Sequence, residues 1–167
     1  MGITDDASRL GVLQVDGTAY AVTRARRGDV PALVTLLADD ELGRGREGGD
    51  LQPYLRAFAR IDRSPDNLLL AVRSPQGEVV ATAHLTMLPG LSRRATLRLQ
   101  VEAVRVASSV RHLGLGTELL EWITGYARSH GAGLVQLSTD RSRPGARRLY
   151  ERLGYVASHD GMKLHLT

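Results

Sequence analysis

The sequence feature that most constrains the fold is a strand pattern that leads through a glycine-containing turn into a helix pattern. Residues 95–106 predict one long β-strand. After a short linker, residues 114–130 carry apolar side chains at helical spacing, and Gly114 and Gly116 lie where that helix begins. A strand joined in this way to a helix that must bury its apolar side predicts a helix packed on a sheet.

Strand and helix patterns alternate along most of the remaining chain. Further strands are predicted at residues 19–25, 68–73 and 79–87, a turn with a buried strand at 131–139, and a closing hairpin at 155–167. Further helices are predicted at residues 29–40, 51–62 and 145–154. The predicted order is β-α-α-β-β-β-α-β-α-β-β, which places the chain in the α/β class as a mixed sheet covered by helices.

The length and composition indicate one domain with a core of aliphatic side chains. The chain has 167 residues, of which 43% are hydrophobic and only 4% aromatic. A chain of this size buries enough apolar surface to fold alone. Residues 1–17 are polar and lack strong periodicity, so we expect a loose lead-in there and a single domain over residues 18–167.

Several classes of protein are disfavoured by what the sequence lacks. It contains no cysteine, which excludes disulfides and thiolate metal ligands and is typical of a cytoplasmic protein. The five histidines lack the spacing of a metal site, so no metal is expected. No apolar run approaches the roughly 20 residues that span a bilayer, and the first residues do not resemble a signal peptide. We therefore expect a cytoplasmic protein without a membrane partner.

The positive charge of the chain raises the question of a nucleic-acid partner. The formal net charge is +4, and all but one of the 22 basic residues are arginines. These arginines are dispersed, and few aromatic side chains are present to stack on bases, so we expect no nucleic-acid partner. A basic nucleic-acid binder is the less favoured alternative, and a local basic patch for a polyanionic ligand stays open.

The glycine turn has the features of an anion-binding site. Glycine permits positive φ values and a close approach of the backbone to a ligand. The first turn of a helix has N–H groups without acceptors and the positive end of the helix dipole, and Arg111 adds charge beside it. Thr117 is not preceded by lysine, which excludes a P-loop, and Leu119 stands where a dinucleotide fingerprint needs a small residue. A Gly-x-Gly pair alone is equally compatible with a tight turn that starts a helix.

The turn is part of one longer motif, and a second motif follows it in the sequence. The first is an Arg-x-x-Gly-x-Gly turn after a strand with one glutamate, formed by Val101, Glu102, Val104, Val106, Arg111, Gly114 and Gly116. The second is an Ala-x-x-x-Tyr-x-x-x-Gly-aromatic motif, formed by Ala146, Tyr150, Gly154 and Tyr155. With these two motifs, the chain resembles the GNAT superfamily of acyl-CoA-dependent N-acyltransferases. In the order of its elements, the resemblance extends over residues 19–166.

This resemblance implies a fold, an acyl donor and a binding site. The implied fold is a central, mostly antiparallel sheet with one splayed parallel pair of strands, flanked by helices. The implied donor is acetyl-CoA or another acyl-CoA, with its pyrophosphate on the glycine turn and its pantetheine arm along the preceding strand. The residues expected to bind it are Val104, Arg105, Val106, Arg111, His112, Leu113, Gly114, Leu115, Gly116, Thr117 and Arg143. Arg143 stands where the family often has asparagine, and we expect it to reach a CoA phosphate instead.

The implied chemistry is transfer of an acetyl group from a thioester to an amine, by direct attack in a ternary complex. Tyr150 is expected to protonate the leaving thiolate. Glu102 is the candidate base, because strand alternation places it on one face with Val104 and Val106. A salt bridge from Glu102 to an arginine is a nearly equal alternative, and His84 or a water molecule is a further candidate base. The N–H of Val106 is expected to polarise the thioester carbonyl.

The sequence leaves the acceptor amine, the acyl chain length and the oligomeric state open. A small-molecule amine is favoured over a protein lysine or N-terminal amine, and a non-catalytic acyl-CoA sensor is an alternative of another class. The charged residues that could receive the acceptor are Asp39, Asp40, Glu41 and Glu47 for a cationic amine, and Arg93 and Arg94 for an acidic group. Ordinary solvated charge is the simpler interpretation of both sets. A homodimer is expected from the resemblance alone.

Overall fold

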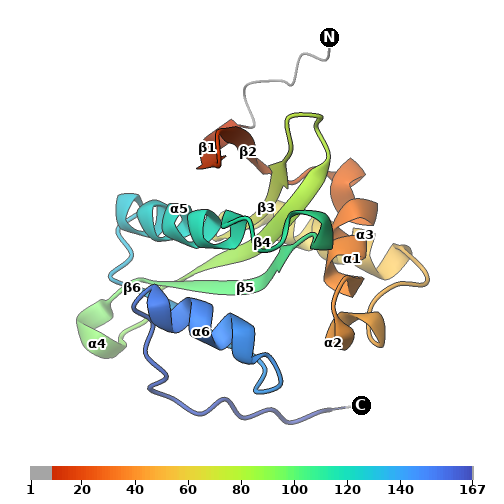
Figure 1. The fold of residues 1–167 in the computed structure, drawn as a ribbon. Coiled ribbons are helices and arrows are strands. Elements are labelled where there is room, and N and C mark those ends of the chain that lie inside the picture. Colours follow the sequence, from red (N-terminus) through yellow and green to blue (C-terminus); the bar gives the residue numbers. More distant parts are fainter. Residues whose placement is uncertain (1–8, 167) are drawn as a thin grey trace.

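Six strands form one mixed sheet in the computed structural model, which describes residues 9–166 (Figure 1). In spatial order the strands are β1 (Arg9–Val15), β2 (Thr18–Arg24), β3 (Asn67–Arg73), β4 (Val79–Leu88), β5 (Arg98–Val106) and β6 (Leu134–Leu137). Every neighbouring pair is antiparallel except β5 and β6, which are parallel. The predicted mixed sheet, mostly antiparallel with one parallel pair, is confirmed.

Helices cover both faces of this sheet. They are α1 (Val30–Ala38), α2 (Glu41–Arg44), α3 (Gln52–Arg63), α4 (Ser92–Ala95), α5 (Leu115–Ser129) and α6 (Pro144–Arg152), with 3-10 turns η2 (Arg27–Asp29) and η3 (Ser108–Val110). Figure 1 shows α5 across one face and α1 and α3 on the other, with α6 beside β5 and β6. No helix within residues 9–166 is long and apolar enough to cross a bilayer.

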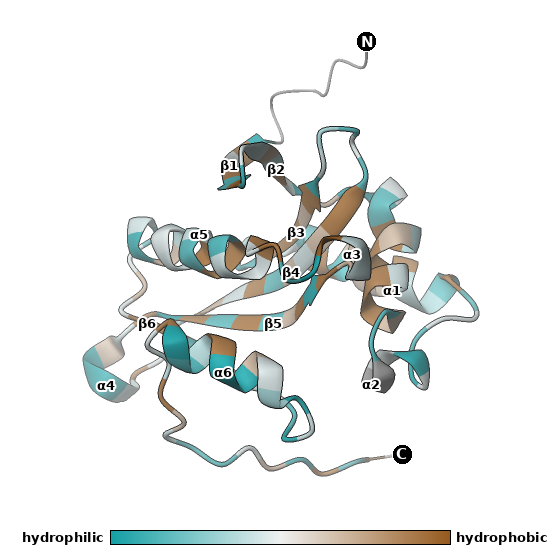
Figure 2. Ribbon diagram, in the orientation of Figure 1, coloured by the Kyte–Doolittle hydropathy of each residue, from teal (hydrophilic) through white to brown (hydrophobic). Residues whose placement is uncertain are grey.

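Strand alternation divides the core into two clusters. Leu70 of β3 packs in one cluster with Ile123 of α5. Its neighbour Ala71 packs in the other cluster with Leu33 of α1 and Phe58 of α3. Because successive side chains of a strand point to opposite faces, β3 contributes to both clusters. Figure 2 shows the hydrophobic colour concentrated on the central strands, as a largely aliphatic core requires.

The predicted loose lead-in over residues 1–17 is wrong for Arg9–Val15, which form β1. This strand pairs antiparallel with β2 through a two-residue turn, and both turn residues, Asp16 and Gly17, have positive φ values of 47° and 77°. An Asp-Gly turn of this kind matches the twist of the strands it joins, so the local signal for a hairpin was present in the sequence. Residues 1–8 of the predicted lead-in lie outside the described residues.

The predicted closing hairpin is also wrong for its described part, residues 155–166, where no strand forms. Figure 1 shows this segment running past α6 without joining the sheet. The side chains of Val156, Met162 and Leu164 are 81%, 93% and 85% exposed. An alternating pattern forms a stable hairpin only when further strands or an apolar surface cover it, and these side chains remain uncovered.

A β-bulge interrupts β5 in the middle of the first family-like motif. Glu102 pairs with His84 and Arg105 pairs with Thr82, so two residues of β5 lie opposite one residue of β4. Ala103, inside the bulge, has a φ of 52°. A bulge bends its strand, increases the local twist and re-aims the side chains that follow.

The bulge changes which side chains of β5 share a face. Residues directly opposite each other in an antiparallel pair point to the same face. Val106 pairs with Ala81 and Glu102 pairs with His84, an odd number of residues apart on β4, so Glu102 and Val106 point to opposite faces. The predicted common face of Glu102, Val104 and Val106 is therefore wrong, because the bulge inserts one residue into the alternation.

The two parallel strands separate at the same place. The pairing of β5 with β4 extends from Arg98 to Val106, whereas its pairing with β6 ends at Val101. Beyond Val101, the edge of β5 that faces β6 therefore has no strand partner within residues 9–166. This geometry is the splayed pair that the resemblance implies, and it positions the candidate site.

Candidate active site

The glycine turn joins the end of β5 to the first turn of α5. Gly114 is the N-cap and has a φ of 94°, a left-handed value that glycine adopts without strain. The first hydrogen bonds of the helix run from the N–H groups of Thr117 and Glu118 to the Gly114 carbonyl. Within residues 9–166, the N–H groups of residues 112–116 have no acceptor. They form a run of backbone donors at a helix N-terminus, which suits an anion.

Gly116 is not required by the packing around it. A Cβ placed there would lie 3.7 Å from Leu149 and 3.7 Å from Val106, which are ordinary contact distances. Glycine inside a helix costs about 1 kcal/mol relative to alanine. A glycine that its protein neighbours do not demand fits a position where a ligand approaches the backbone closely. The same contacts show that the turn, the end of β5 and α6 meet at one point.

Arg111 ties the turn to the link between α1 and α2. Its Nε donates to the Val106 carbonyl at 2.9 Å, and its Nη2 lies 3.0 Å from Oδ2 of Asp39. The same oxygen of Asp39 accepts a hydrogen bond from the Ser108 N–H at 2.8 Å. The guanidinium predicted to face a pyrophosphate thus orders the turn, and the backbone N–H groups are left as the donors for an anion.

Asp40 contacts two of the arginines predicted to bind acetyl-CoA. Its Oδ2 lies 3.2 Å from Nε of Arg105 and 3.4 Å from Nη2 of Arg143, and its Oδ1 accepts from the Gly43 N–H. Burial raises the pKa of Asp40, but the Gly43 hydrogen bond and the two guanidinium groups outweigh burial and hold the pKa below its usual value. Because Arg105 pairs with Thr82, its side chain lies on the face of β5 that carries Glu102.

The free edge of β5 offers one backbone donor to a ligand. The Ala107 N–H donates to the Val80 carbonyl on β4 at 2.8 Å. Strand alternation therefore turns the N–H of Val106 away from β4, toward the open edge. The carbonyls of Val104 and Val106 already accept hydrogen bonds from arginine side chains at 2.9 Å. The Val106 N–H therefore faces this open edge, whereas the two carbonyls are engaged.

Tyr150 of α6 is a buried residue near the free edge of β5. Its side chain is 9% exposed and packs edge-on against Tyr155, with ring centroids 5.8 Å apart. Gly154, with a φ of 87°, ends α6 and lets the chain turn back so that the Tyr155 N–H bonds the Tyr150 carbonyl. Burial raises the pKa of Tyr150, and the charges of Arg143 and Arg105 oppose that rise. The phenol is therefore protonated at neutral pH and can donate.

Glu102 is exposed and lies opposite His84 across the β4–β5 pair. No arginine of the described chain lies within ion-pair distance of Glu102, so the alternative of a salt bridge is not formed there. Burial lowers the pKa of His84, and the nearby Glu102 only partly offsets this effect. His84 is therefore neutral at pH 7 and brings no positive charge to the neighbouring Glu102.

Asn67 is a residue of this region that the sequence did not reveal. Its Oδ1 accepts from Thr86 Oγ1 at 2.9 Å and lies 2.7 Å from His84 Nε2, while its Nδ2 donates to Ser64 Oγ at 2.8 Å. Because an amide oxygen only accepts, His84 carries its proton on Nε2 and has a lone pair on Nδ1. The position of Asn67 at the start of β3 is the only sequence signal, and it does not indicate this network.

The charged residues expected to receive the acceptor have different surroundings. Both aspartates of the α1–α2 link pair with arginines, and Glu47 accepts from the Tyr54 hydroxyl at 3.0 Å. The side chain of Glu41 lies outside the described residues. Arg93 and Arg94 are exposed on α4, at the start of β5 and so at the end opposite the glycine turn.

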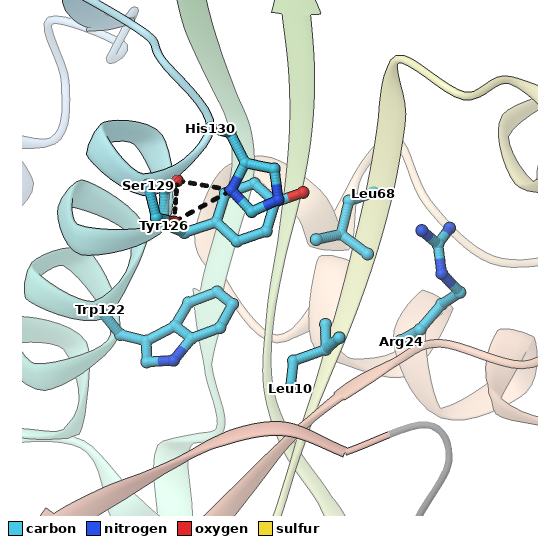
Figure 3. Close-up of a pocket in the computed structure, with 7 residues that line it drawn as sticks. All are labelled: Leu10, Arg24, Leu68, Trp122, Tyr126, Ser129 and His130. Atoms are coloured by element: carbon cyan, nitrogen blue, oxygen red, sulfur yellow. Dashed lines mark hydrogen bonds between the residues drawn. The ribbon is translucent and has the colours of Figure 1, made fainter.

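A separate hollow lies near the C-terminal end of α5 (Figure 3). It has a volume of about 400 Å³. Trp122, Tyr126 and His130 form its α5 side as a ladder of stacked rings, with centroid distances of 5.5 and 3.9 Å. Leu68 and Arg24 face this ladder from the strands. None of the residues predicted to bind acetyl-CoA lines this hollow.

Within residues 9–166, no cluster of three or more acidic or histidine side chains could hold a metal ion.

Comparisons with known proteins identify the family of this chain. The chain matches the Acetyltransferase (GNAT) family model over residues 31–155. It is 34% identical to an aminoalkylphosphonate N-acetyltransferase from Salmonella typhimurium over 131 residues, 78% of this chain and 79% of that protein. It is similar to the crystal structure of a transcriptional regulator from Bacillus halodurans C-125, with a TM-score of 0.83, 37% identity and coverage of 88% of this chain and 99% of that one. A Trypanosoma brucei acetyltransferase has a TM-score of 0.71, 25% identity and coverage of 88% and 99%. The chain belongs to the GNAT family of acetyltransferases, and its activity is acetyl transfer.

Proposed function

We propose that the protein transfers an acetyl group from acetyl-CoA to the primary amine of a small molecule, by direct attack in a ternary complex. One observation carries this proposal: the free edge of β5, the unbonded N–H groups of the glycine turn and the buried Tyr150 meet at one place. The contacts around Gly116 bring these elements together. A thioester along this edge would have backbone donors for its phosphates and a phenol for its sulfur.

Each step of the reaction has a group to perform it. The substrate ammonium loses a proton to Glu102, directly or through water, and the nitrogen attacks the thioester carbon. Negative charge then develops on the thioester oxygen, which the Val106 N–H stabilises. As the carbon–sulfur bond breaks, Tyr150 gives its phenolic proton to the sulfur and regains a proton from the former amine nitrogen. The products are the N-acetyl compound, CoA thiol and the proton on Glu102.

Glu102 is a better candidate base than His84. The carboxylate is exposed and unpaired among the described residues. The Nε2 of His84 is engaged with Asn67, which leaves only Nδ1 to accept a proton. We therefore assign the proton of the substrate ammonium to Glu102, and we expect His84 to stay neutral beside it.

The proposed acceptor is a small molecule rather than a protein. The Salmonella relative is named for acetylation of aminoalkylphosphonates, and its similarity covers 78% of this chain. Aminoalkylphosphonates are therefore the first acceptors to test.

We further propose a cytoplasmic location, since the sequence has no cysteine, and a homodimer, which the family resemblance suggests.

Release of CoA thiol from acetyl-CoA, measured across aminoalkylphosphonates, amino acids, simple amines and peptides, tests this proposal. Tyr150→Phe should lower kcat by about 10²- to 10⁴-fold, because it removes the proton donor, without changing the affinity for acetyl-CoA. Glu102→Gln should lower kcat over a similar range, and His84→Gln should lower it much less. Tyr126→Phe, on the far part of α5, is the matched control and should be unchanged.

Two outcomes would contradict the proposal. Tight binding of acetyl-CoA without turnover of any amine would favour the acyl-CoA sensor. Failure to bind acetyl-CoA would show that the glycine turn serves another purpose.

A further inference from the structure

The carboxylate of Asp40 contacts two arginines that come from different elements. Arg105 comes from β5, and Arg143 is the residue that precedes the first turn of α6. Their guanidinium nitrogens lie 3.2 and 3.4 Å from the same carboxylate oxygen. The side chain of Arg105 is 10% exposed, that of Asp40 15% and that of Arg143 30%. The three charges form a compact and largely buried group that reaches solvent at Arg143.

This group carries an excess of positive charge. Two guanidinium groups and one carboxylate leave a net charge of +1. Arg46 also acts on Asp40 and Arg105 from a longer distance, but it lies 3.8 Å from its own counter-ion, Glu47. Net charge in a largely buried group is costly unless a counter-charge joins it. One further negative charge would balance the group.

The hydrogen bonds of Arg105 also indicate that an anion binds to this group. A guanidinium has five N–H donors, and Nη1 of Arg105 donates to the Val104 carbonyl at 2.9 Å. Its Nε and the Oδ2 of Asp40 are both buried, yet neither makes a hydrogen bond of good geometry within residues 9–166. Buried polar atoms are seldom left in this state. A ligand oxygen at this place would use the donors that Asp40 does not satisfy.

The group lies beside the tyrosine that we propose as the acid. The charges of Arg143 and Arg105 act directly on the Tyr150 phenol. Arg143 is the N-cap of α6, the helix that carries Tyr150, and Arg105 directly precedes Val106 at the end of β5. An anion bound by the two arginines would therefore lie between the end of β5 and α6, the two elements that carry the proposed reacting groups.

We propose that Arg105 and Arg143 bind an acid group of the acceptor, so that the enzyme selects small amines that carry a phosphonate or a carboxylate. This inference rests on the proposed function and names its substrate class. Asp40 is the positioning residue, because it holds the two guanidinium groups side by side and neutralises one of their charges. The acid group then meets one excess charge and several N–H donors. Two arginines that the sequence assigned to acetyl-CoA are thereby assigned to the acceptor.

Three acceptors of similar length test this assignment. They are 2-aminoethylphosphonate, β-alanine and propylamine, which carry a phosphonate, a carboxylate and no acid group. We would measure kcat and KM for each, at saturating acetyl-CoA, in the natural protein and in Arg143→Gln, Arg143→Lys and Arg147→Gln. Arg147 is the matched control, because it lies one turn further along α6, is 63% exposed and pairs with Glu151.

The natural protein should prefer the two acids over propylamine in kcat/KM. Arg143→Gln should raise KM for both acids about 10- to 100-fold, the range expected for loss of a charge-assisted hydrogen bond, and Arg143→Lys should recover part of the loss. The KM values of propylamine and acetyl-CoA should not change, and Arg147→Gln should behave as the natural protein. A rise in the KM of acetyl-CoA instead, or no preference for acids in the natural protein, would overturn the assignment.

Binding measurements separate this inference from the proposed function. Methylphosphonate, an acid without an amine, is titrated by calorimetry into the natural protein and into Arg143→Gln, with circular dichroism to verify that the variant is folded. Binding that is lost in Arg143→Gln supports the anion site even if no amine is acetylated, in which case only the proposed function fails. No binding of methylphosphonate, together with acetylation of propylamine, overturns the anion site and leaves the proposed function standing.

Discussion

Asp39 and Asp40 are neighbours in the chain, yet each organises a different part of the site. Asp39 bonds Arg111 and so orders the glycine turn. Asp40 holds Arg105 and Arg143 beside the proposed acid. The link between α1 and α2 therefore connects the glycine turn with the anion site proposed for the acceptor, through two carboxylates. Their charge suggested binding of a cationic amine, but both are occupied by arginines of the protein itself.

Replacement of Asp40 tests this arrangement at the scale of one residue. Asp40→Asn should lower the free energy of unfolding at neutral pH by about 1–3 kcal/mol, because Arg105 keeps a largely buried charge without its counter-ion. Since the pKa of Asp40 in the folded protein is below its usual value, its contribution is present above about pH 4 and is lost as the pH falls through the folded pKa.

Urea unfolding at neutral pH and at about pH 3 measures this contribution. The difference between the natural protein and Asp40→Asn should shrink on acidification. A difference that stays the same at both pH values would show that the carboxylate charge of Asp40 does not stabilise the fold.

At the scale of elements, the strand, turn and helix of the first motif were predicted from local pattern. The helix predicted at residues 114–130 is observed as α5, Leu115–Ser129, and the strand at 95–106 as β5, Arg98–Val106. The bulge at Ala103 was not predicted, because an extra residue leaves the apolar pattern almost unchanged and depends on how β4 pairs. For this reason Glu102 was placed on the wrong face although it was correctly located in the strand.

Two glycines of the same segment make a matched pair for the role of the turn. Gly114→Ala should destabilise the protein by about 1–2 kcal/mol, because its φ of 94° is unfavourable for a residue with a Cβ. Gly125→Ala, at an exposed position inside α5 with open space around it, should stabilise by about 0.5–1 kcal/mol.

Thermal unfolding and acetyl-CoA titration of both variants measure these effects. Only Gly114→Ala should weaken the binding of acetyl-CoA, since only this change disturbs the N–H groups at the helix N-terminus. Equal affinities in the two variants would contradict the role of the turn in binding.

At the scale of the whole molecule, the segment at residues 155–166 departs most from the sequence prediction. Its alternating pattern indicated strands, but it joins no sheet, and Met162, Leu164 and Leu166 are 93%, 85% and 88% exposed. Removal of residues 157–167 should therefore change the free energy of unfolding by no more than about 0.5 kcal/mol, as expected for exposed positions. Urea unfolding of the full and shortened chains makes the comparison.

Hydrogen exchange gives a second view of the same segment. Its backbone amides should exchange rapidly, whereas those of β3 and β4 should be protected, because only the latter are bonded within the sheet. Protection of residues 155–166, or a large loss of stability on truncation, would mean that the predicted hairpin forms in solution.

The sequence by itself determined the order of the main elements from β2 to α6, the glycine turn and the residues of both motifs. Periodicity, turn residues and capping act over a few positions, so they can be recognised without the fold. The tertiary structure alone decided which arginines remain available to a ligand. Arg111 and Asp39 are 72 positions apart, and their bond, like that of Asp40 with Arg105 and Arg143, exists only because the sheet brings distant segments together. Ion pairing depends on distances of a few ångströms in space, which separation along the chain does not determine.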